Sequence, residues 1–199
     1  MGRIVVMNHV TLDGVMQGPG RPDEDTRGGF TKGGWGSATA GEAAGQAMGE
    51  RMAAGGGLAG WLFGRRTYEE LLSYWNQQPD SPFGSMLNSA RKYVASTTLE
   101  EPLPWPNSTL LRGDIADAVP ALKAQSSGVL AIMGSGVLIG SLMAADLIDE
   151  YLLMIHPLVL GTGRRLFPDN VHVPLRLTES VTTPTGVVIA AYESAGDQT

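Results

Sequence analysis

Residues 129 to 167 constrain the fold of this chain more than any other stretch. An apolar run from Val129 to Met133 stops at the turn Gly134-Ser135-Gly136, and a helical pattern then extends from Val137 to about Ala145. A second apolar run covers Tyr151 to Leu160. Neither run alternates with polar residues, which is typical of strands buried on both faces of a sheet. The stretch therefore predicts strand, glycine turn, helix and strand, and it favours an α/β fold.

Composition narrows the function classes. The 199 residues are 43% hydrophobic and carry a net charge of −6, which opposes binding to nucleic acid or to an anionic membrane. The absence of cysteine excludes disulfides, thiolate metal sites and cysteine nucleophiles, and the three histidines have no metal-ligand spacing, so no metal is expected. We expect one domain over residues 1–199, with its core at about 3–193. The first residues lack a signal-peptide pattern, so a cytoplasmic protein is the default expectation.

The remaining elements follow from apolar runs and turn residues. Strands are expected at 3–12, 58–63, 93–96 and 108–111, with a terminal antiparallel hairpin from 174–181 and 186–192. Helices are expected at 37–54, from Arg65 onward and after Asp114, which can cap its helix. Residues 75–83 carry prolines and are expected to form a loop.

The stretch from Asp13 to Gly36 is too rich in glycine for a regular element. Phe30 and Trp35 argue against disorder, because a solvated linker does not need two large aromatic rings. We interpret this stretch as a partly ordered lid over a pocket. Gln17 and Trp35 are candidates for its substrate side, although Trp35 is equally compatible with a plug that packs the loop down.

Three turns after strands suit phosphate groups. Gly64-Arg65-Arg66-Thr67 and Gly134-Ser135-Gly136 place glycines before helix starts, whose free N–H groups attract anions, and Ser96-Thr97 adds hydroxyls after a third strand. The purely structural alternatives are that the glycine turns only pack a helix against a strand, and that Arg65 and Arg66 are solvated surface residues. Neither glycine turn completes a Rossmann fingerprint, so a dinucleotide is only a weak inference from these residues.

These motifs, in this order, carry a family resemblance. Thr11–Gly14, Leu62–Tyr68 and Met133–Leu138 resemble the dihydrofolate-reductase-like superfamily, and 147–151, 156–161 and 165–167 continue the match. The chain is most similar to the branch that contains the reductase domain of riboflavin biosynthesis, and the glycine-rich segment 18–35 resembles its stand-alone bacterial members. The resemblance covers about residues 3 to 193.

The resemblance implies a three-layer fold, with a central mixed but mostly parallel sheet of about eight strands, a C-terminal antiparallel hairpin and helices on both faces. It also implies NADPH as the cofactor. Arg65, Arg66 and Thr67 would then hold the adenosine side, with Ser96 and Thr97 near the 2′-phosphate. The turn after Gly64 and the residues Met133, Gly134, Ser135, Gly136, Val137 and Leu138 would contact the cofactor, and the loop from Asp13 and Gly14 onward would close over the nicotinamide.

The leading hypothesis is an NADPH-dependent reductase of a small heterocyclic (pterin- or pyrimidine-like) or carbonyl substrate. Asp13 is the first candidate for a proton donor, although an Asp-Gly turn accounts for it at least as well. Glu42 and Glu50 are looser candidates. His9 and His156 are expected to be ordinary strand residues. A non-catalytic, dimeric NADPH-binding or sensor module is the alternative. A homodimer is expected because the long apolar run at 151–160 has few charges nearby, and because relatives in the branch that the chain resembles commonly pair through sheet edges and neighbouring helices.

Overall fold

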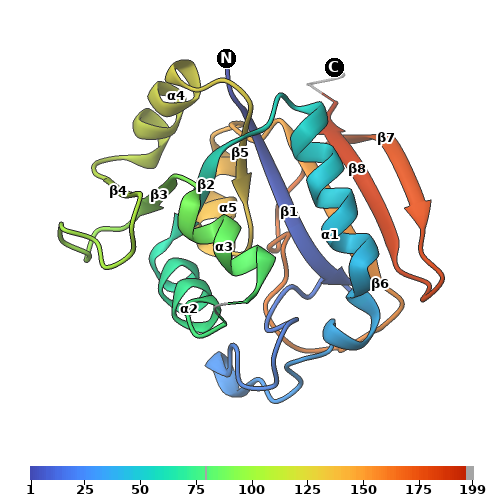
Figure 1. Cartoon of the computed structure of the whole chain (residues 1–199). Coiled ribbons are helices and arrows are strands. Elements are labelled where there is room, and N and C mark those ends of the chain that lie inside the picture. The colour runs from blue at the N-terminus through green and yellow to red at the C-terminus, as the bar shows by residue number, and fades with distance from the viewer. Residues whose placement is uncertain (79, 196–199) are drawn as a thin grey trace. The chain divides into compact units, whose positions relative to one another are not determined.

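The computed structural model describes residues 1–78 and 80–195 (Figure 1). These residues form two compact units, the first from 1–4 and 52–147 and the second from 5–51 and 148 onward. Each unit is described by itself. The single domain that the sequence favours therefore stays a prediction.

The first unit contains four parallel strands: β2 (Leu58–Gly64), β3 (Lys92–Ala95), β4 (Ser108–Leu111) and β5 (Val129–Ile132). They lie in the order β4-β3-β2-β5, and every neighbouring pair is parallel. All four residues of β5 are buried, as the unbroken apolar run predicts. Parallel order places the carboxyl ends of all four strands at one edge.

Four helices flank these strands: α2 (Arg65–Trp75), α3 (Pro82–Ser89), α4 (Ile115–Gln125) and α5 (Gly136–Ala144). α2 contacts α3 and α4 contacts α5, and right-handed crossovers put the two pairs on opposite faces. The sequence reading missed α3. Its start lies inside the stretch expected as a loop, where the Ser81 hydroxyl accepts from the Gly84 N–H and Pro82 occupies the first helical turn.

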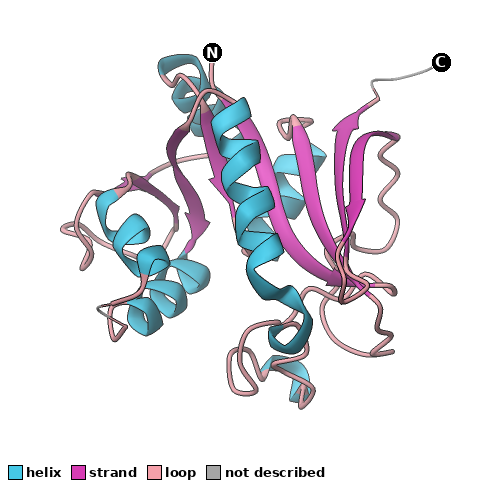
Figure 2. Ribbon diagram, turned by 45° about the vertical axis from the view of Figure 1, so that its right-hand side comes forward, coloured by secondary structure: helices cyan, strands magenta, loops and turns pink. Residues whose placement is uncertain are grey.

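The second unit contains β1 (Arg3–Thr11), a 3-10 turn (Arg27–Gly29), α1 (Ser37–Ala54), β6 (Glu150–His156), β7 (Leu175–Thr182) and β8 (Val188–Ser194). The strand order is β1-β6-β8-β7, with β1 and β6 parallel and the last two pairs antiparallel. α1 lies across one face of these strands (Figure 2). Ala44 and Met48 are buried along it, and Arg51 forms an ion pair with the buried Glu150 of β6.

The expected fold class is confirmed: an α/β protein with mostly parallel strands and a C-terminal antiparallel hairpin. One boundary is wrong, because β6 ends at His156 and does not reach Leu160. Pro157 follows and cannot donate to the ladder. No helix in the described ranges is long and apolar enough to cross a membrane.

One argument for the homodimer, the one from the apolar run, is also wrong. β6 lies between β1 and β8, and Tyr151 and Met154 are only 1% and 0% exposed, so this run needs no second subunit to cover it. The exposed apolar residues of the unit include Leu177 and Val181 on the edge strand β7, at 51% and 56%. The homodimer stays a prediction.

Candidate functional site

The three turns that the sequence analysis assigned to phosphate groups, after Gly64, Ala95 and Met133, lie together at the carboxyl ends of the parallel strands in the first unit. β3, β2 and β5 are neighbours, Gly64 at the end of β2 is level with Ala95, and the β2–β5 register places Trp61 opposite Ala131. Ser96 follows directly after Ala95, and the Gly134 turn follows β5. Pairing of parallel strands therefore brings together segments that are 30 to 70 residues apart in the chain.

A direct hydrogen bond joins two of these turns. The Gly64 N–H donates to Ser135 Oγ at 2.8 Å. Ser135 lies between Gly134 and Gly136, so this hydrogen bond links the start of α2 to the start of α5. Ser135 adopts a left-handed conformation with φ 65°, which is unfavourable for a residue with a Cβ. Strain of this kind is kept where the surroundings impose it, often at ligand sites.

Thr67 fixes the other contact between the turns. A Cβ atom added to Gly134, whose φ is +68°, would lie only 3.2 Å from Thr67 Cγ2 and 3.3 Å from its Oγ1. Glycine is therefore required at 134 both by conformation and by the close approach of α2.

The helices α2 and α5 both begin without a side-chain cap. Gly64 has no side chain that could cap α2, and Ser135 Oγ accepts from the Gly64 N–H rather than from an N–H of the helix that Ser135 precedes. By contrast, Ser81 caps α3 and Asp114 caps α4. Two adjacent helix starts thus retain N–H groups and positive dipole ends, which is the arrangement that binds phosphate oxygens.

The basic residues of α2 lie beside this edge. Arg65 is half-exposed and pairs with Glu69 one turn later at 3.1 Å, while Arg66 and Thr97 are exposed. Ser96 Oγ accepts from the N–H groups of Thr98 and Leu99, so it shapes its own turn.

The two side chains of the first turn of α5 differ. Val137 is 75% exposed at the helix start, whereas Leu138 is 6% exposed and packs towards Gly64. Met133 is half-buried and Gly136 is the first residue of the helix. Apolar surface on Val137 is available to a ligand, while Leu138 offers only its backbone.

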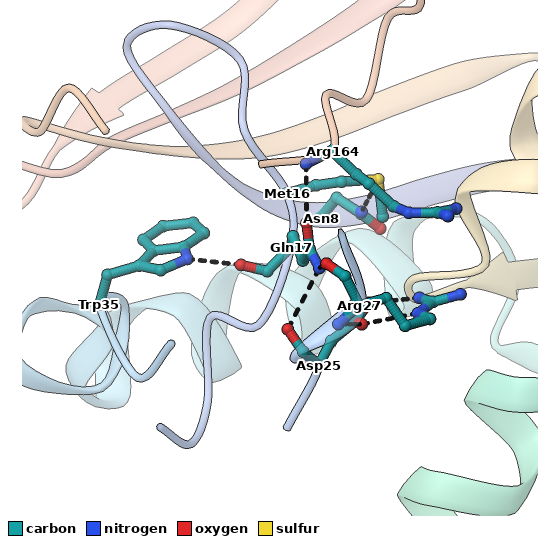
Figure 3. Close-up of polar contacts among 7 residues, drawn as sticks. All are labelled: Asn8, Met16, Gln17, Asp25, Arg27, Trp35 and Arg164. Atoms are coloured by element: carbon teal, nitrogen blue, oxygen red, sulfur yellow. Dashed lines mark hydrogen bonds and ion pairs between the residues drawn. The ribbon is translucent and has the colours of Figure 1, made fainter. Parts of the chain in front are cut away.

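In the second unit, Gln17 is the centre of the lid (Figure 3). Its side-chain amide donates to the carbonyl oxygens of Asp25 and Arg27 at 3.1 and 3.0 Å, and its Oε1 accepts from the Arg164 N–H at 2.9 Å. The residue is only 4% exposed. Gln17 therefore joins three backbone segments, and a substrate contact by this residue stays a prediction.

Trp35 packs the lid down. Its indole N–H donates to the Gln17 carbonyl at 2.7 Å, and its ring meets His156 edge-on, with centroids 5.1 Å apart. Phe30 is 4% exposed. These contacts favour the plug interpretation of Trp35, and a substrate contact by its remaining surface stays a prediction.

Asp13 belongs to a turn that fastens the loop after β1 to the loop after β6. Its carboxylate accepts from Thr11 Oγ1 at 2.5 Å, from the Gly161 N–H at 2.8 Å and from the Leu160 N–H at 3.2 Å. The hydrogen bond from Thr11, and then those from the backbone, lower the pKa of Asp13 to about 2. A general acid needs a raised pKa, so these contacts argue against Asp13 as the proton donor. Gly14, with φ +80°, completes the same turn.

The looser acid candidates lie elsewhere. Glu42 and Glu50 are exposed on α1, and Glu50 accepts from the Gln46 side chain at 2.7 Å. His9 and His156 contact each other, which the sequence did not predict. They are strand residues as expected, but His9 Nδ1 lies 2.9 Å from His156 Nε2, and His156 Nδ1 lies 2.6 Å from Thr39 Oγ1. The two histidines are 147 positions apart in the sequence, so there is no local signal for this contact.

Comparison with known proteins agrees with the fold. The model of the RibD C-terminal domain matches residues 3–189. The uncharacterized protein YyaP of Bacillus subtilis (strain 168) is 31% identical over 141 residues, which cover 68% of this chain and 73% of YyaP.

Solved structures show the same architecture. A putative riboflavin biosynthesis protein from Shewanella sp. PV-4 superposes with a TM-score of 0.66 at 23% identity, covering 98% of this chain and 99% of the other. A pyrimidine reductase-like protein from Corynebacterium diphtheriae gives 0.63 at 11% identity, with 98% and 93% covered. Dihydrofolate reductase from Enterococcus faecalis, complexed with NADP(H) and RAB-propyl, gives 0.60 at 13% identity, with 98% and 97% covered.

Proposed function

Because the chain belongs to the RibD C-terminal domain family, we propose that it is an NADPH-dependent reductase of a small heterocyclic (pterin- or pyrimidine-like) or carbonyl substrate. Within this proposal, the first unit holds the phosphates of the cofactor. The solved relative whose name includes NADP(H) supports a nicotinamide cofactor for this fold.

The observation that carries the proposal is the pair of uncapped helix starts joined by the Gly64–Ser135 hydrogen bond. A pyrophosphate brings acceptor oxygens and negative charge, which is what two adjacent sets of free N–H groups and dipole ends favour. Gly64, Gly134 and Gly136 carry no side chain that would stand between the backbone and such a ligand. The residues present therefore fit the phosphates of a dinucleotide.

Arg65, Arg66 and Thr67 follow the first of these helix starts, with Thr97 on the neighbouring strand end. A guanidinium binds a phosphate through two parallel N–H donors, so this side of the edge suits the 2′-phosphate that distinguishes NADPH from NADH. Arg66 is exposed, whereas Arg65 already pairs with Glu69. We therefore assign the larger share of phosphate recognition to Arg66.

When bound, NADPH supplies the hydride, and the protein supplies position, exclusion of water and a proton. In the second unit, Gln17 and Trp35 hold the lid in one conformation, which keeps its backbone polar groups paired and excludes water from beneath it. A protonated Asp13 has no place in this scheme because its pKa is lowered.

Turnover distinguishes this proposal from the alternative, an NADPH-binding sensor. The decisive assay follows the loss of NADPH absorbance at 340 nm with a panel of pterins, pyrimidines and quinones, using heat-unfolded protein as the control. A reductase oxidises NADPH with at least one pterin or pyrimidine at a rate above that of the control. NADPH that binds by calorimetry and is oxidised with none of these acceptors would identify the sensor instead.

A further inference from the structure

A hollow of about 680 Å³ lies in the first unit, and its lining residues do not include those of the turns after Gly64 and Met133. It is formed by the beginnings of β3 and β4 and by the segment between these strands. Its lining residues that carry charge or apolar surface include Arg91, Tyr93, Glu101, Pro102, Leu103 and Trp105. Small-molecule sites commonly have volumes of about 300–1,000 Å³. The hollow is therefore large enough for a small molecule.

The hollow exists because the connection between β3 and β4 is irregular. β4 is the edge strand of the first unit, and residues 96–107, which join it to β3, contain no helix (Figure 1). Parallel strands are usually joined by a helix that packs on the sheet. Here prolines at 102, 104 and 106 remove backbone donors, so no regular element forms. The connection instead forms one wall of the hollow.

Hydrogen bonds hold both ends of this wall. At its start, Ser96 Oγ accepts from two backbone N–H groups of the turn after β3, at 3.1 and 3.0 Å. At its end, the Trp105 N–H donates to the hydroxyl of Tyr68, which is buried on α2, at 3.1 Å. The Tyr68 hydroxyl in turn donates to Ser108 Oγ on β4 at 3.0 Å. The hollow is therefore preformed, which lowers the entropic cost of binding a ligand.

Tyr93 gives the hollow aromatic surface. A Cβ atom added to Gly60 would lie 2.8 Å from Tyr93 Cε2 and 3.2 Å from its Cδ2, so the ring rests directly on the backbone of β2. A glycine inside a strand often marks such a close approach. Leu103 and Trp105 are half-buried in the opposite wall and add apolar surface. This part of the hollow favours an aromatic ring or a branched aliphatic group.

Two opposite charges line the same hollow. The exposed guanidinium of Arg91 makes no hydrogen bond or ion pair with any residue that the structure describes, Glu101 included. The Glu101 carboxylate has two long contacts, 3.5 Å from the Leu110 N–H and 3.7 Å to the Arg112 guanidinium. Exposed contacts of this length contribute little, so the carboxylate retains capacity for a cation. The hollow thus offers one place for an anionic group and another for a cationic group.

We propose that this hollow binds an α-amino acid with an aromatic or large aliphatic side chain. The α-carboxylate pairs with Arg91, and the α-ammonium group pairs with Glu101. The side chain of the ligand packs against Tyr93, Leu103 and Trp105. This binding site is separate from the proposed reductase function, and neither depends on the other.

The two charges distinguish this ligand from other classes. A phosphate ester or a dicarboxylate brings a second negative charge towards Glu101, which repels it, and a diamine meets the same objection at Arg91. A neutral ring compound uses the apolar surface but leaves both charges without a partner. A zwitterion with one apolar substituent is complementary to all three parts of the hollow.

Calorimetric titration of the full chain with L-phenylalanine, in the absence of nucleotide, tests the proposal. Two analogues each lack one charge: hydrocinnamate has no ammonium group and phenethylamine has no carboxylate. L-Phenylalanine should bind with a dissociation constant below about 1 mM. Each analogue should bind at least about fivefold more weakly, because it loses one charge-assisted contact.

Substitutions locate the binding. Arg91→Gln and Glu101→Gln should each weaken L-phenylalanine binding at least about fivefold, whereas Arg91→Lys, which keeps the charge, should weaken it less. Glu100→Gln is the matched control, since Glu100 is the exposed neighbour of Glu101 and does not line the hollow. Glutamine at 101 keeps an oxygen for the Leu110 N–H, and equal urea midpoints would show that the variants fold like the parent protein.

Three results would overturn the proposal. The first is no binding of L-phenylalanine at concentrations up to about 10 mM. The second is hydrocinnamate or phenethylamine binding as tightly as the amino acid. The third is parent affinity in both R91Q and E101Q, which would place the amino acid elsewhere on the molecule. Because no nucleotide or acceptor is present, none of these results bears on the reductase function.

Discussion

Gln17 offers the sharpest test of how the lid is held. Its side chain makes three hydrogen bonds, to the carbonyls of Asp25 and Arg27 and from the N–H of Arg164, and it is 4% exposed. A net value of about 0.5–1.5 kcal/mol for each bond gives about 3 kcal/mol for the three. Gln17→Ala should therefore lower the free energy of opening the lid by about this amount, which is a factor of about 100 in the population of the open state.

Hydrogen exchange of the ligand-free protein measures this opening. The N–H groups of Gly34 and Gly36 are useful reporters, because they donate to the carbonyls of Gly18 and Pro19 and not to the Gln17 side chain. Both should exchange about 100-fold faster in Q17A. Gln77→Ala is the control, since Gln77 is exposed and makes one local hydrogen bond in the first unit.

Unchanged exchange at Gly34 and Gly36 in Q17A would refute the reasoning. It would mean that the lid is held by its apolar contacts alone, with Phe30 and Trp35 sufficient to keep it closed. Rapid exchange of these amides already in the parent protein would show instead that the lid opens freely until ligand binds.

Three further predictions concern other residues. Ser135→Ala removes the hydrogen bond to Gly64, so it should weaken NADPH binding about fivefold, as measured by calorimetry. Ser135→Gly should weaken binding by a similar factor, although it also relieves the strain of the left-handed conformation. If both variants bind NADPH as tightly as the parent protein, the prediction is wrong. Burial lowers the pKa of Lys92 to about 8. Between about pH 8 and 10.5 the unfolded chain therefore binds more protons than the folded chain, so the free energy of unfolding should rise with pH over this range. The rise should reach up to about 3 kcal/mol and can be measured by urea unfolding. Lys92→Met should abolish this rise, and a flat profile in the parent protein would be the contrary result. Light scattering at micromolar concentration should give the mass of a dimer, and a monomer mass would count against it.

The meeting of the glycine turns at the carboxyl ends of β2 and β5 was predictable because its signals are local. A glycine at the end of an apolar run followed by a helical pattern marks a turn, and parallel strands bring such turns together at one edge. The role of Ser135 was not predictable, because its hydroxyl bonds to a residue 71 positions away. α3 was not predicted, although Ser81-Pro82 is a usual helix-start signal, because the prolines at 75–83 are equally typical of a loop.

In the second unit, the contacts of the polar residues could not be predicted from the sequence. The glycine-rich stretch was predicted to be a partly ordered lid with aromatic anchors, and Phe30 is indeed buried. The contacts of its polar residues could not be predicted, because they involve residues far away in the sequence. Asp13 is bonded to residues 160 and 161, and Gln17 to residue 164. The His9–His156 contact requires the β1–β6 register, which no pattern within either strand reveals.

Calorimetric titration with NADPH and NADH tests the central claim most directly. We predict that NADPH binds at least about tenfold more tightly than NADH, because each charge-assisted contact to the 2′-phosphate contributes about 1.5–3 kcal/mol. Arg66→Ala should narrow this gap by weakening NADPH and leave NADH nearly unchanged. Equal dissociation constants for the two nucleotides, or no binding of either, would contradict the account.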